Sequence, residues 1–327
     1  MNMSKRVREH LINALASGEF VSGQELGEQL GISRTAISKH IKAIMEMGLD
    51  IFSVTGKGYK LSDPLKLLNH TKIVKSIPSG SFIPEIEVHS LIDSTNSYLL
   101  RRIPNQVTNG QVCLAEFQSA GRGRRGRQWV SPFGSQIYLS MYWYLEQGLS
   151  AAMGISLVTA LAVSDAIYSL TDINVQLKWP NDIYLNVVKL AGILIDLEGQ
   201  ALEPSHSVIG IGLNLNMPVK AAENIDQKWT DLQSHTQGTV DRDELSAMLI
   251  YSLITRLEQY QDEGLSSMLD EWHARDFYLD KRVKLLTGER VTRGICRGVN
   301  NQGALLLEIN GKVKPIYGGE VSLRGDE

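Results

Sequence analysis

The sequence is poor in cysteine and lacks any long uncharged hydrophobic run. Its 327 residues include two cysteines, Cys113 and Cys296, each inside a strand-like segment. Two distant thiols argue against a disulfide framework and predict two buried small side chains. The seven histidines are scattered without the spacing of zinc ligands, so no protein-bound metal is expected. No run of about 18 apolar residues is present to span a bilayer.

A convincing secretion signal is also missing. Three basic residues precede the apolar segment 11–16. This segment is shorter than the ~7–15 residues of a true signal core, Asn13 lies within it and Glu19 follows soon after. We therefore interpret it as part of a short amphipathic helix. The protein is expected to be cytoplasmic and to make no contact with a membrane.

A large excess of charge of one sign is absent as well. The formal net charge of −3 excludes bulk nucleic-acid binding, and 43% hydrophobic residues are typical of a globular protein with a core. At about 100–200 residues per domain, the length predicts two or three domains. Between Arg34 and Lys60, however, five basic residues face two acidic ones, which favours a small DNA-reading module.

Residues 1–63 have the pattern of a winged helix-turn-helix domain. Apolar residues four apart in segment 7–15 predict a first helix. A Ser-x-x-Glu capping box at Ser22 begins a second helix, which Gly31 ends. Ser33 then caps a third helix that Gly48 closes. Two short helices separated by a few residues around a glycine are typical of helix-turn-helix motifs.

The third helix and the segment after it carry the side chains expected at DNA. Segment 51–61 alternates like a β-hairpin around a glycine-rich turn with Lys57 at its tip, which predicts the wing. Basic and hydroxyl side chains bond phosphates and base edges. The candidate DNA-binding residues are Ser33, Arg34, Thr35, Ser38, Lys39, Lys42 and Lys57. A protein-interaction module is the alternative, and the basic, hydroxyl-rich face favours DNA.

The densest feature of the sequence is a loop rich in glycine and arginine. Gly121–Arg127 matches G-x-G-x-x-G and follows the apolar segment Val112–Phe117. A dinucleotide-binding fingerprint requires an apolar helix next, whereas Gln128 and Pro132 follow here, and the proline would break such a helix. The loop is therefore not a Rossmann motif, and the P-loop pattern is absent too.

Four arginines in this loop predict an anion-binding site. With few acidic neighbours the free loop would repel itself, whereas a triphosphate together with a carboxylate would neutralise and order it, with bidentate arginine–phosphate bonds. A solvated surface is the commoner fate of basic stretches. Glycine alternating with arginine nevertheless lets the backbone approach a ligand, which favours binding.

Four further clusters accompany this loop. They are Asp93-Ser94-Thr95-Asn96, Lys178-Trp179-Pro180-Asn181-Asp182, Lys189–Ile195 and the glycine-spaced strand Ser207–Asn216. The second suggests a rigid turn that directs polar groups into a cleft. The other three have ordinary alternatives, namely a helix N-cap, a solvent-exposed lysine and a tightly packed strand. Each cluster is a weak to moderate signal by itself.

Taken together and in this order, the clusters and the loop closely resemble biotin–protein ligases. The N-terminal winged helix resembles the bifunctional bacterial type, which is also the repressor of the biotin operon. The resemblance spans essentially the whole chain, and the Gly/Arg loop with Lys178–Asp182 is highly specific. Two departures stand out: the turn Asn186-Val187-Val188 is less polar than is usual, and 219–229 shows no matching motif apart from Trp229.

The resemblance implies an α+β fold with three domains. Residues 1–63 form the winged helix-turn-helix domain, 64–275 a mixed-sheet α/β catalytic domain of the biotin/lipoate ligase type, and 276–327 a small SH3-like β-barrel. A helix capped at Asp241 and short strands between 283 and 317, joined by glycine turns, agree with this expectation.

The resemblance also implies an activity and partners. The enzyme would activate biotin with ATP as biotinyl-5'-AMP, with Mg²⁺ bound to ATP, and transfer it to a lysine of the biotin carboxyl carrier protein of acetyl-CoA carboxylase. The adenylate-bound homodimer would bind operator DNA. A lipoate–protein ligase, a biotin-sensing repressor without ligase activity and a monofunctional ligase remain alternatives. No general base for the transfer step is identified.

The resemblance assigns roles to individual residues. The candidate catalytic residues are Lys189, Arg122 and Lys178. The candidate biotin-binding residues are Ser94, Thr95, Asn96, Gln118, Gly121, Arg122, Gly123, Arg124, Lys189 and Gly192. The candidate adenylate-binding and ATP-binding residues are Arg122, Arg124, Trp129, Asn181, Asn214 and Arg324.

Overall fold

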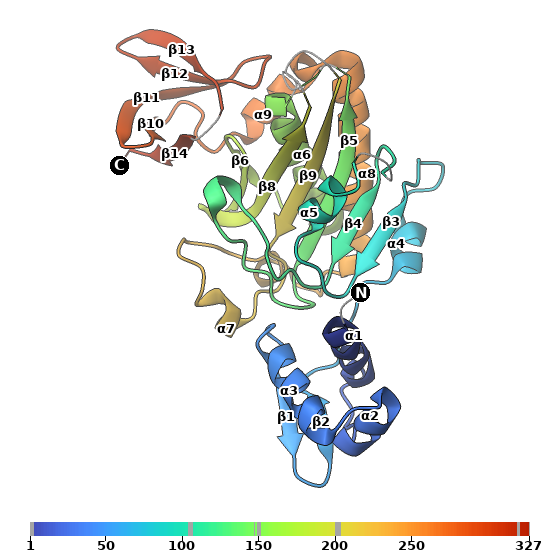
Figure 1. Ribbon diagram of the computed structural model, residues 1–327. Coiled ribbons are helices and arrows are strands. Elements are labelled where there is room, and N and C mark those ends of the chain that lie inside the picture. The colour runs from blue at the N-terminus through green and yellow to red at the C-terminus, as the bar shows by residue number, and fades with distance from the viewer. Residues whose placement is uncertain are drawn as a thin grey trace.

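The computed structural model has three parts in chain order, and Figure 1 shows the N-terminal part below a large central sheet and the C-terminal sheet above it. The N-terminal part is connected to the rest through residues that follow its hairpin. The structure describes residues 3–103, 107–146, 148, 152–199, 204–318 and 321–326.

The N-terminal part is the predicted helix-turn-helix with its wing. Its elements are α1 (Met3–Leu15), α2 (Gly23–Leu30), α3 (Arg34–Met45), β1 (Ile51–Val54) and β2 (Gly58–Leu61). The predicted caps are confirmed: the Ser22 hydroxyl accepts from the Gln24 amide at 3.3 Å, and the Ser33 hydroxyl accepts from the Ala36 amide at 3.2 Å. Gly31 ends α2 with a φ of 65°. Helix α3 ends three residues before Gly48, which has a φ of 99°.

The central part is built on a seven-stranded sheet with the order β3-β4-β5-β9-β8-β7-β6. Strands β3 and β4 are parallel and the remaining neighbours are antiparallel, which confirms the expected mixed sheet. The strands are β3 (Ile86–His89), β4 (Val112–Ala115), β5 (Ile137–Leu145), β6 (Gln176–Lys178), β7 (Asp182–Leu185), β8 (Val188–Glu198) and β9 (Ser205–Leu213).

Helices cover both faces of this sheet. Helices α6 and α8 lie together behind it and α5 lies in front (Figure 1). The helices are α4 (His70–Ser76), α5 (Thr95–Leu100), α6 (Ala152–Thr171), α7 (Val219–Ala222), α8 (Arg242–Glu263) and α9 (Leu269–Arg275). Asp241 caps α8 as expected, accepting from the amides of Asp243 and Glu244. In the described part of the chain, Gly154–Thr171 is long and apolar enough to cross a membrane, and 67% of it is buried inside the protein.

The C-terminal part is a five-stranded antiparallel sheet with the order β13-β12-β11-β10-β14. Its strands are β10 (Arg282–Thr287), β11 (Arg290–Val299), β12 (Leu305–Ile309), β13 (Lys312–Ile316) and β14 (Val321–Gly325). The first four agree with the sequence prediction, whereas β14 was not predicted because it is a short, half-polar segment. The prediction of two buried free cysteines is confirmed for Cys113 and Cys296.

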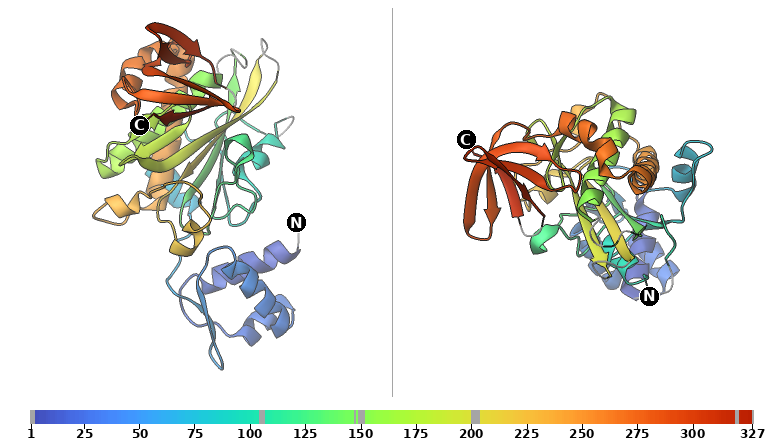
Figure 2. Two further views of the ribbon diagram at one scale, coloured as in Figure 1. Left: turned by 90° about the vertical axis from the view of Figure 1, so that its left-hand side faces the viewer. Right: turned by 90° about the horizontal axis from the view of Figure 1, so that it is seen from above.

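The N-terminal part shares a hydrophobic cluster with the central part. Leu91, Phe117 and Phe133 of the central part pack together with buried side chains from α1, α3 and the hairpin. The Phe133 amide also donates to the Met47 carbonyl at 2.9 Å, just after α3. The left-hand view of Figure 2 shows the N-terminal part below one end of the central part. The winged helix is therefore packed against the strands that carry the site described below.

Replacement of Val187 by glycine is expected to stabilise the protein. Asn186 and Val187 form the two-residue turn between β7 and β8 with φ values of 50° and 69°, a geometry that favours glycine at the second position. Val187 is 67% exposed, so its side chain contributes little packing. We expect Val187→Gly to raise the free energy of unfolding by about 1 kcal/mol, measured by urea denaturation.

Val219 provides the matched control for this prediction. It is a valine with 82% exposure in the short helix α7 and has no positive φ. Val219→Gly should give no gain in stability, because glycine relieves no strain there and is a poor helix former. A Val187→Gly variant that is no more stable than the wild type would contradict the strain argument.

Candidate ligand-binding site

Two adjoining cavities open on the front of the central sheet. The larger has a volume of about 350 Å³ and the smaller about 50 Å³. Both are bordered by the same five residues, Gly123, Arg124, Trp129, Asn181 and Lys189. The structure therefore brings the Gly/Arg loop into contact with the Lys178–Asp182 motif and the Lys189 strand, which lie much further along the chain. A ligand in one cavity would meet a ligand in the other at this shared wall.

The smaller cavity is lined by polar side chains from the start of α5 and the end of β4. Ser94 caps α5, since its hydroxyl accepts from the Ser97 amide at 3.4 Å, and it also lines the cavity. Its N-cap role and a role in binding are therefore compatible. The Gln118 side-chain oxygen accepts from the Thr95 amide at 2.9 Å and from the Thr95 hydroxyl at 3.1 Å. These contacts fix the polar wall before any ligand arrives.

Asn96 is held by the protein at both ends of its amide. Its nitrogen donates to the Leu194 carbonyl at 3.2 Å and to the Asp196 carboxylate at 2.9 Å. Its oxygen accepts from the hydroxyl of Ser140, a fully buried residue of β5. Asn96 is therefore part of the frame of the cavity as well as part of its lining.

Glycines in β9 make room for the side chains of the site. A Cβ atom on Gly210 would lie 2.2 Å from the Asn96 side-chain oxygen, and one on Gly212 would lie 2.5 Å from the Trp129 ring. Real Cβ contacts are never this short, so only glycine allows Asn96 and Trp129 to lie against the sheet. The tight packing expected of this strand is confirmed, and its partners are site residues. The buried Trp129 Nε1 has no hydrogen-bond partner.

The Gly/Arg loop folds back on itself as a compact flap. The Trp129 amide donates to the Gly121 carbonyl at 2.9 Å, and the Gly123 amide donates to the Arg127 carbonyl at 2.7 Å. A single 3-10 turn, Arg124–Gly126, forms its tip, and Arg125 there has a φ of 61°. No α-helix follows the loop up to β5, which agrees with the rejection of a Rossmann motif.

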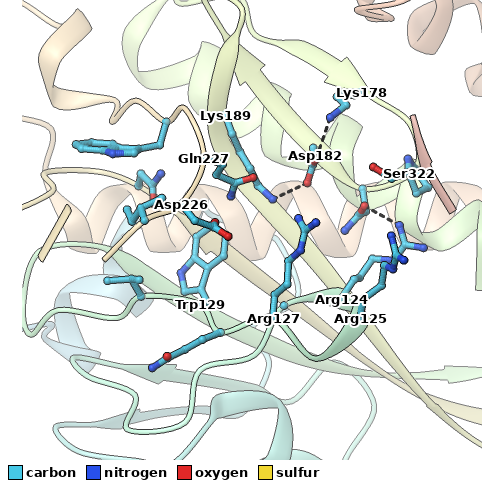
Figure 3. A pocket seen from close by; sticks show the side chains of 18 of the residues that line it. Arg124, Arg125, Arg127, Trp129, Lys178, Asp182, Lys189, Asp226, Gln227 and Ser322 are labelled. Carbon is cyan, nitrogen blue, oxygen red and sulfur yellow. Dashed lines mark hydrogen bonds and ion pairs between the residues drawn. The ribbon is translucent and has the colours of Figure 1, made fainter. Parts of the chain in front are cut away.

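The arginines of this flap have different environments. Arg122 pairs with Asp196 at 2.8 Å, and Arg124 donates to the Asn181 side chain at 2.9 Å. Burial lowers the pKa of the Arg124 guanidinium, although Asp182 acts in the opposite direction. Arg125 and Arg127 are exposed and line the larger cavity. Figure 3 shows the Arg127 guanidinium directed toward the pair formed by Lys189 and Asp182.

A carboxylate between two lysines forms one wall of the larger cavity. Asp182 lies 2.7 Å from the Lys189 ammonium and 3.5 Å from the Lys178 ammonium, and all three side chains are less than 20% exposed (Figure 3). Burial raises the pKa of Asp182, but the two positive charges outweigh it, so the pKa lies below its usual value. Lys178 also bonds the Tyr184 hydroxyl at 2.8 Å. The wall is therefore a fixed, ionised cluster with net positive charge.

The remaining candidates for nucleotide contact lie around the same cavity. Asn214 lines it and donates to the Thr230 carbonyl at 3.1 Å. Arg324 lies on β14, where it is exposed, while its neighbours Val321, Ser322 and Leu323 line the cavity. The structure thus brings β14 to the site without placing Arg324 in its wall.

Several residues of the site were not identified from the sequence. They are Ser131, Ser140, Tyr184, Asp196 and the segment 224–227, and no role was given to Asp182. A signal existed for Asp182, which ends the Lys178–Asp182 motif, whereas Ser140 and Asp196 are single polar residues in apolar strands. Within the described ranges, no group of three or more His, Cys, Asp or Glu side chains is arranged to hold a metal ion.

The structure places the candidate DNA-binding residues at the surface. Ser33, Arg34, Thr35, Ser38, Lys39 and Lys42 lie at the N-cap or in α3, Lys57 lies in the turn of the hairpin, and all seven are exposed. The opposite face of α3 is buried through Ile37, Ile41 and Ile44. Packing of that face leaves the basic side chains free to meet a ligand.

Comparison with known proteins agrees with this arrangement. Three family models match: an HTH domain at residues 7–60, the Biotin/lipoate A/B protein ligase family at 88–214, and the Biotin protein ligase C terminal domain at 278–324. The chain is similar to the bifunctional ligase/repressor BirA of Salmonella typhimurium, with 48% identity over 97% of both chains. It is also 32% identical to the biotin–[acetyl-CoA-carboxylase] ligase of Mycobacterium tuberculosis, over 75% of this chain and 91% of that protein.

A solved structure extends this likeness to three dimensions. Biotin protein ligase from Aquifex aeolicus, in complex with biotin and ATP, superposes with a TM-score of 0.63 and 29% sequence identity. It covers 75% of this chain, and all of that protein is matched. The HTH domain at residues 7–60 lies within the 97% of this chain that aligns with the Salmonella protein. The chain therefore belongs to the biotin–protein ligases, and within them to the bifunctional ligase/repressors.

Proposed function

We propose that the smaller cavity binds biotin and the larger cavity binds ATP, and that the two substrates react at Lys189. The observation that carries this proposal is the wall common to both cavities, in which Lys189 lies. Ser94, Thr95 and Gln118 offer hydroxyl and amide groups suited to a ureido ring. A volume of about 350 Å³ is within the usual range for a small-molecule site, and the cavity is lined by arginines and lysines suited to phosphates.

The first step needs positioned charge more than a protein nucleophile. An oxygen of the biotin carboxylate attacks the α-phosphorus, the bond to the β-phosphate breaks, and pyrophosphate leaves. The biotin carboxylate and the α-phosphate are both negatively charged and repel each other. The positive charges of Lys189, Arg122 and Lys178 reduce this repulsion. Asp182 holds both ammonium groups in place and thereby fixes their direction. Mg²⁺ is expected to arrive on ATP, whose phosphates supply its oxygen ligands.

The second step transfers the biotinyl group to a protein. An acceptor lysine attacks the acyl carbon of the adenylate, the carbon–oxygen bond to AMP breaks, and the lysine nitrogen loses a proton. We propose the biotin carboxyl carrier protein of acetyl-CoA carboxylase as the acceptor, in keeping with the resemblance noted above. The nucleotide contacts are assigned to Arg124, Trp129, Asn181, Asn214 and Arg324, and the biotin contacts further include Asn96, Gly121, Gly123 and Gly192.

The N-terminal domain is assigned to operator DNA. We place its boundary after residue 63 and the start of the C-terminal domain at residue 276. Ligand that orders the Gly/Arg loop lowers the entropy cost of pairing two chains, so the adenylate should favour a homodimer. Two winged helices would then contact two half-sites of one operator. Consumption of the adenylate by the acceptor would release the operator.

Lys189→Ala is expected to abolish adenylate formation. Loss of the ammonium removes a charge from the point where carboxylate and α-phosphate meet, so kcat/KM should fall by about 100-fold or more. The measurement is biotin-dependent release of pyrophosphate from ATP. Lys75→Ala, which removes an exposed lysine of α4, is the control and should behave as the wild type.

The same assay separates the alternatives. Release with biotin and none with lipoate is the expected result for the wild type. Tight biotin binding without release would instead indicate a biotin-sensing repressor, and release with lipoate would indicate a lipoate ligase. Full activity of Lys189→Ala would show that the reaction is not located at the common wall.

Lys39→Ala is expected to weaken DNA binding without affecting the ligase. The exposed ammonium on α3 would contact a phosphate, so the affinity should fall and the slope of log affinity against log salt should decrease by about 1. Fluorescence anisotropy with DNA from upstream of the biotin biosynthesis genes measures both. Lys314→Ala on β13 removes an exposed lysine of the C-terminal sheet and is the control. Unchanged affinity and slope for Lys39→Ala would argue against this DNA-binding face.

The coupling of ligand, dimer and DNA gives a separate expectation. A non-hydrolysable analogue of biotinyl-5'-AMP should increase both self-association, measured by sedimentation, and affinity for the operator. Both should rise over the same range of analogue concentration, because one equilibrium underlies them. An analogue that binds tightly and changes neither quantity would refute the coupling.

A further inference from the structure

We infer that Asp196 is a positioning residue for biotin binding, which fastens the Gly/Arg flap over the smaller cavity without touching the ligand. The inference rests on the proposed function of that cavity. Asp196 lies on β8, and its Oδ2 atom accepts from Arg122 at 2.8 Å and from Asn96 at 2.9 Å. Asp196 is not one of the described residues that line either cavity. It therefore acts through its two partners.

The flap needs such a tether because its backbone hydrogen bonds are largely internal. The bonds that join Gly121 to Trp129 and Gly123 to Arg127 close the loop on itself and leave its position against the sheet to side chains. Arg122 reaches β8 through Asp196, and Arg124 reaches the turn after β6 through Asn181. The first of these joins the flap to the strand that forms the floor of the cavity.

Asp196 also completes a chain of polar contacts across that floor. The buried Ser140 hydroxyl donates to the Asn96 oxygen, and the Asn96 nitrogen donates to Asp196, which in turn binds Arg122. The Asn96 side chain lies directly against Gly210, because a Cβ atom added to that glycine would be 2.2 Å from the Asn96 side-chain oxygen. Asn96 therefore has no room to move toward the sheet. One carboxylate oxygen thus sets the direction of a lining amide and the position of the flap together.

The location of the pair predicts which step it affects. Biotin must pass the flap to leave, so release requires the contact between Arg122 and Asp196 to open. The Arg122 side chain is 44% exposed and that of Asp196 is 21% exposed, so salt should weaken their attraction. The reacting groups lie at Lys189, in the wall that the two cavities share. Loss of the pair should therefore act mainly on biotin release and KM, with a smaller fall in kcat for pyrophosphate release because Arg122 also stabilises charge in that step.

Asp196→Asn tests this assignment, because asparagine keeps an acceptor for Asn96 and removes the charge that holds Arg122. We expect biotin to dissociate about 5-fold faster, with a similar rise in its KM and a smaller fall in kcat. Dissociation from the full-length protein can be followed by stopped-flow fluorescence, since Trp129 borders the cavity. Higher salt should speed dissociation from the wild type and have little effect on the variant. Asp196→Glu, which keeps the charge, should restore the salt dependence.

Glu308→Gln is the matched control. It breaks another arginine–carboxylate pair, at 2.7 Å from Arg297 and with 39% and 24% exposed side chains, in the C-terminal sheet. Dissociation of biotin from this variant should equal that from the wild type. If the pair acts as one unit, the double variant Arg122→Gln/Asp196→Asn should release biotin no faster than Arg122→Gln alone.

Two results would overturn the inference. Unchanged dissociation with unchanged salt dependence in Asp196→Asn would show that the pair does not hold the flap. A lower kcat with normal dissociation would place Asp196 in the chemical step instead. Wild-type protein that neither binds biotin nor releases pyrophosphate would refute the proposed function. An active wild type, combined with an Asp196→Asn variant whose biotin dissociation is unchanged, would refute this inference alone.

Discussion

The ionised cluster of Lys178, Asp182 and Lys189 is the constraint on which the arrangement of the site depends. A buried carboxylate is costly unless cations compensate it, and the two lysines compensate Asp182 only while they are held close to it. The antiparallel pairing of β6, β7 and β8 supplies that geometry, because it puts Lys178 and Lys189 on either side of Asp182. The cluster keeps a net positive charge, which suits a wall where a carboxylate must meet a phosphate.

The remaining side chains of the site pack closely against the sheet beside this wall. Glycines of β9 let Asn96 and Trp129 lie directly on the sheet, and the flap folds over them. Trp129 lies beneath Lys189, whose ammonium is 5.6 Å from the ring centroid, so the aromatic ring and the ion cluster support each other. The two cavities are thus separated by a few side chains with fixed neighbours, and this explains why they share five lining residues.

The winged helix is in contact with this assembly. Leu91, Phe117 and Phe133 belong to its hydrophobic cluster, and each lies within a few residues of a lining side chain: Ser94, Gln118 and Trp129, respectively. Packing in protein interiors is dense enough that a shift on one side is felt on the other. A helix-turn-helix unit that shares a hydrophobic cluster with segments next to the cavity suits the proposed coupling of the two activities.

The sequence by itself determined the features that depend on residues close together in the chain. The caps at Ser22, Ser33 and Asp241 and the φ of Gly31 follow from local backbone chemistry, so helix starts and ends could be predicted. The motifs from Ser94 to Asn214 indicated the family through their residue types and their order along the chain, because members of one family share a chain order that chemistry alone leaves free.

Tertiary structure alone decided which of these side chains meet. It gave Asp196 two partners from separate elements, matched Gly210 to Asn96, and brought β14 to the larger cavity. The contacts of Asp196 and Gly210 join residues roughly 75 to 115 positions apart. They depend on strand order and packing, which no local pattern encodes.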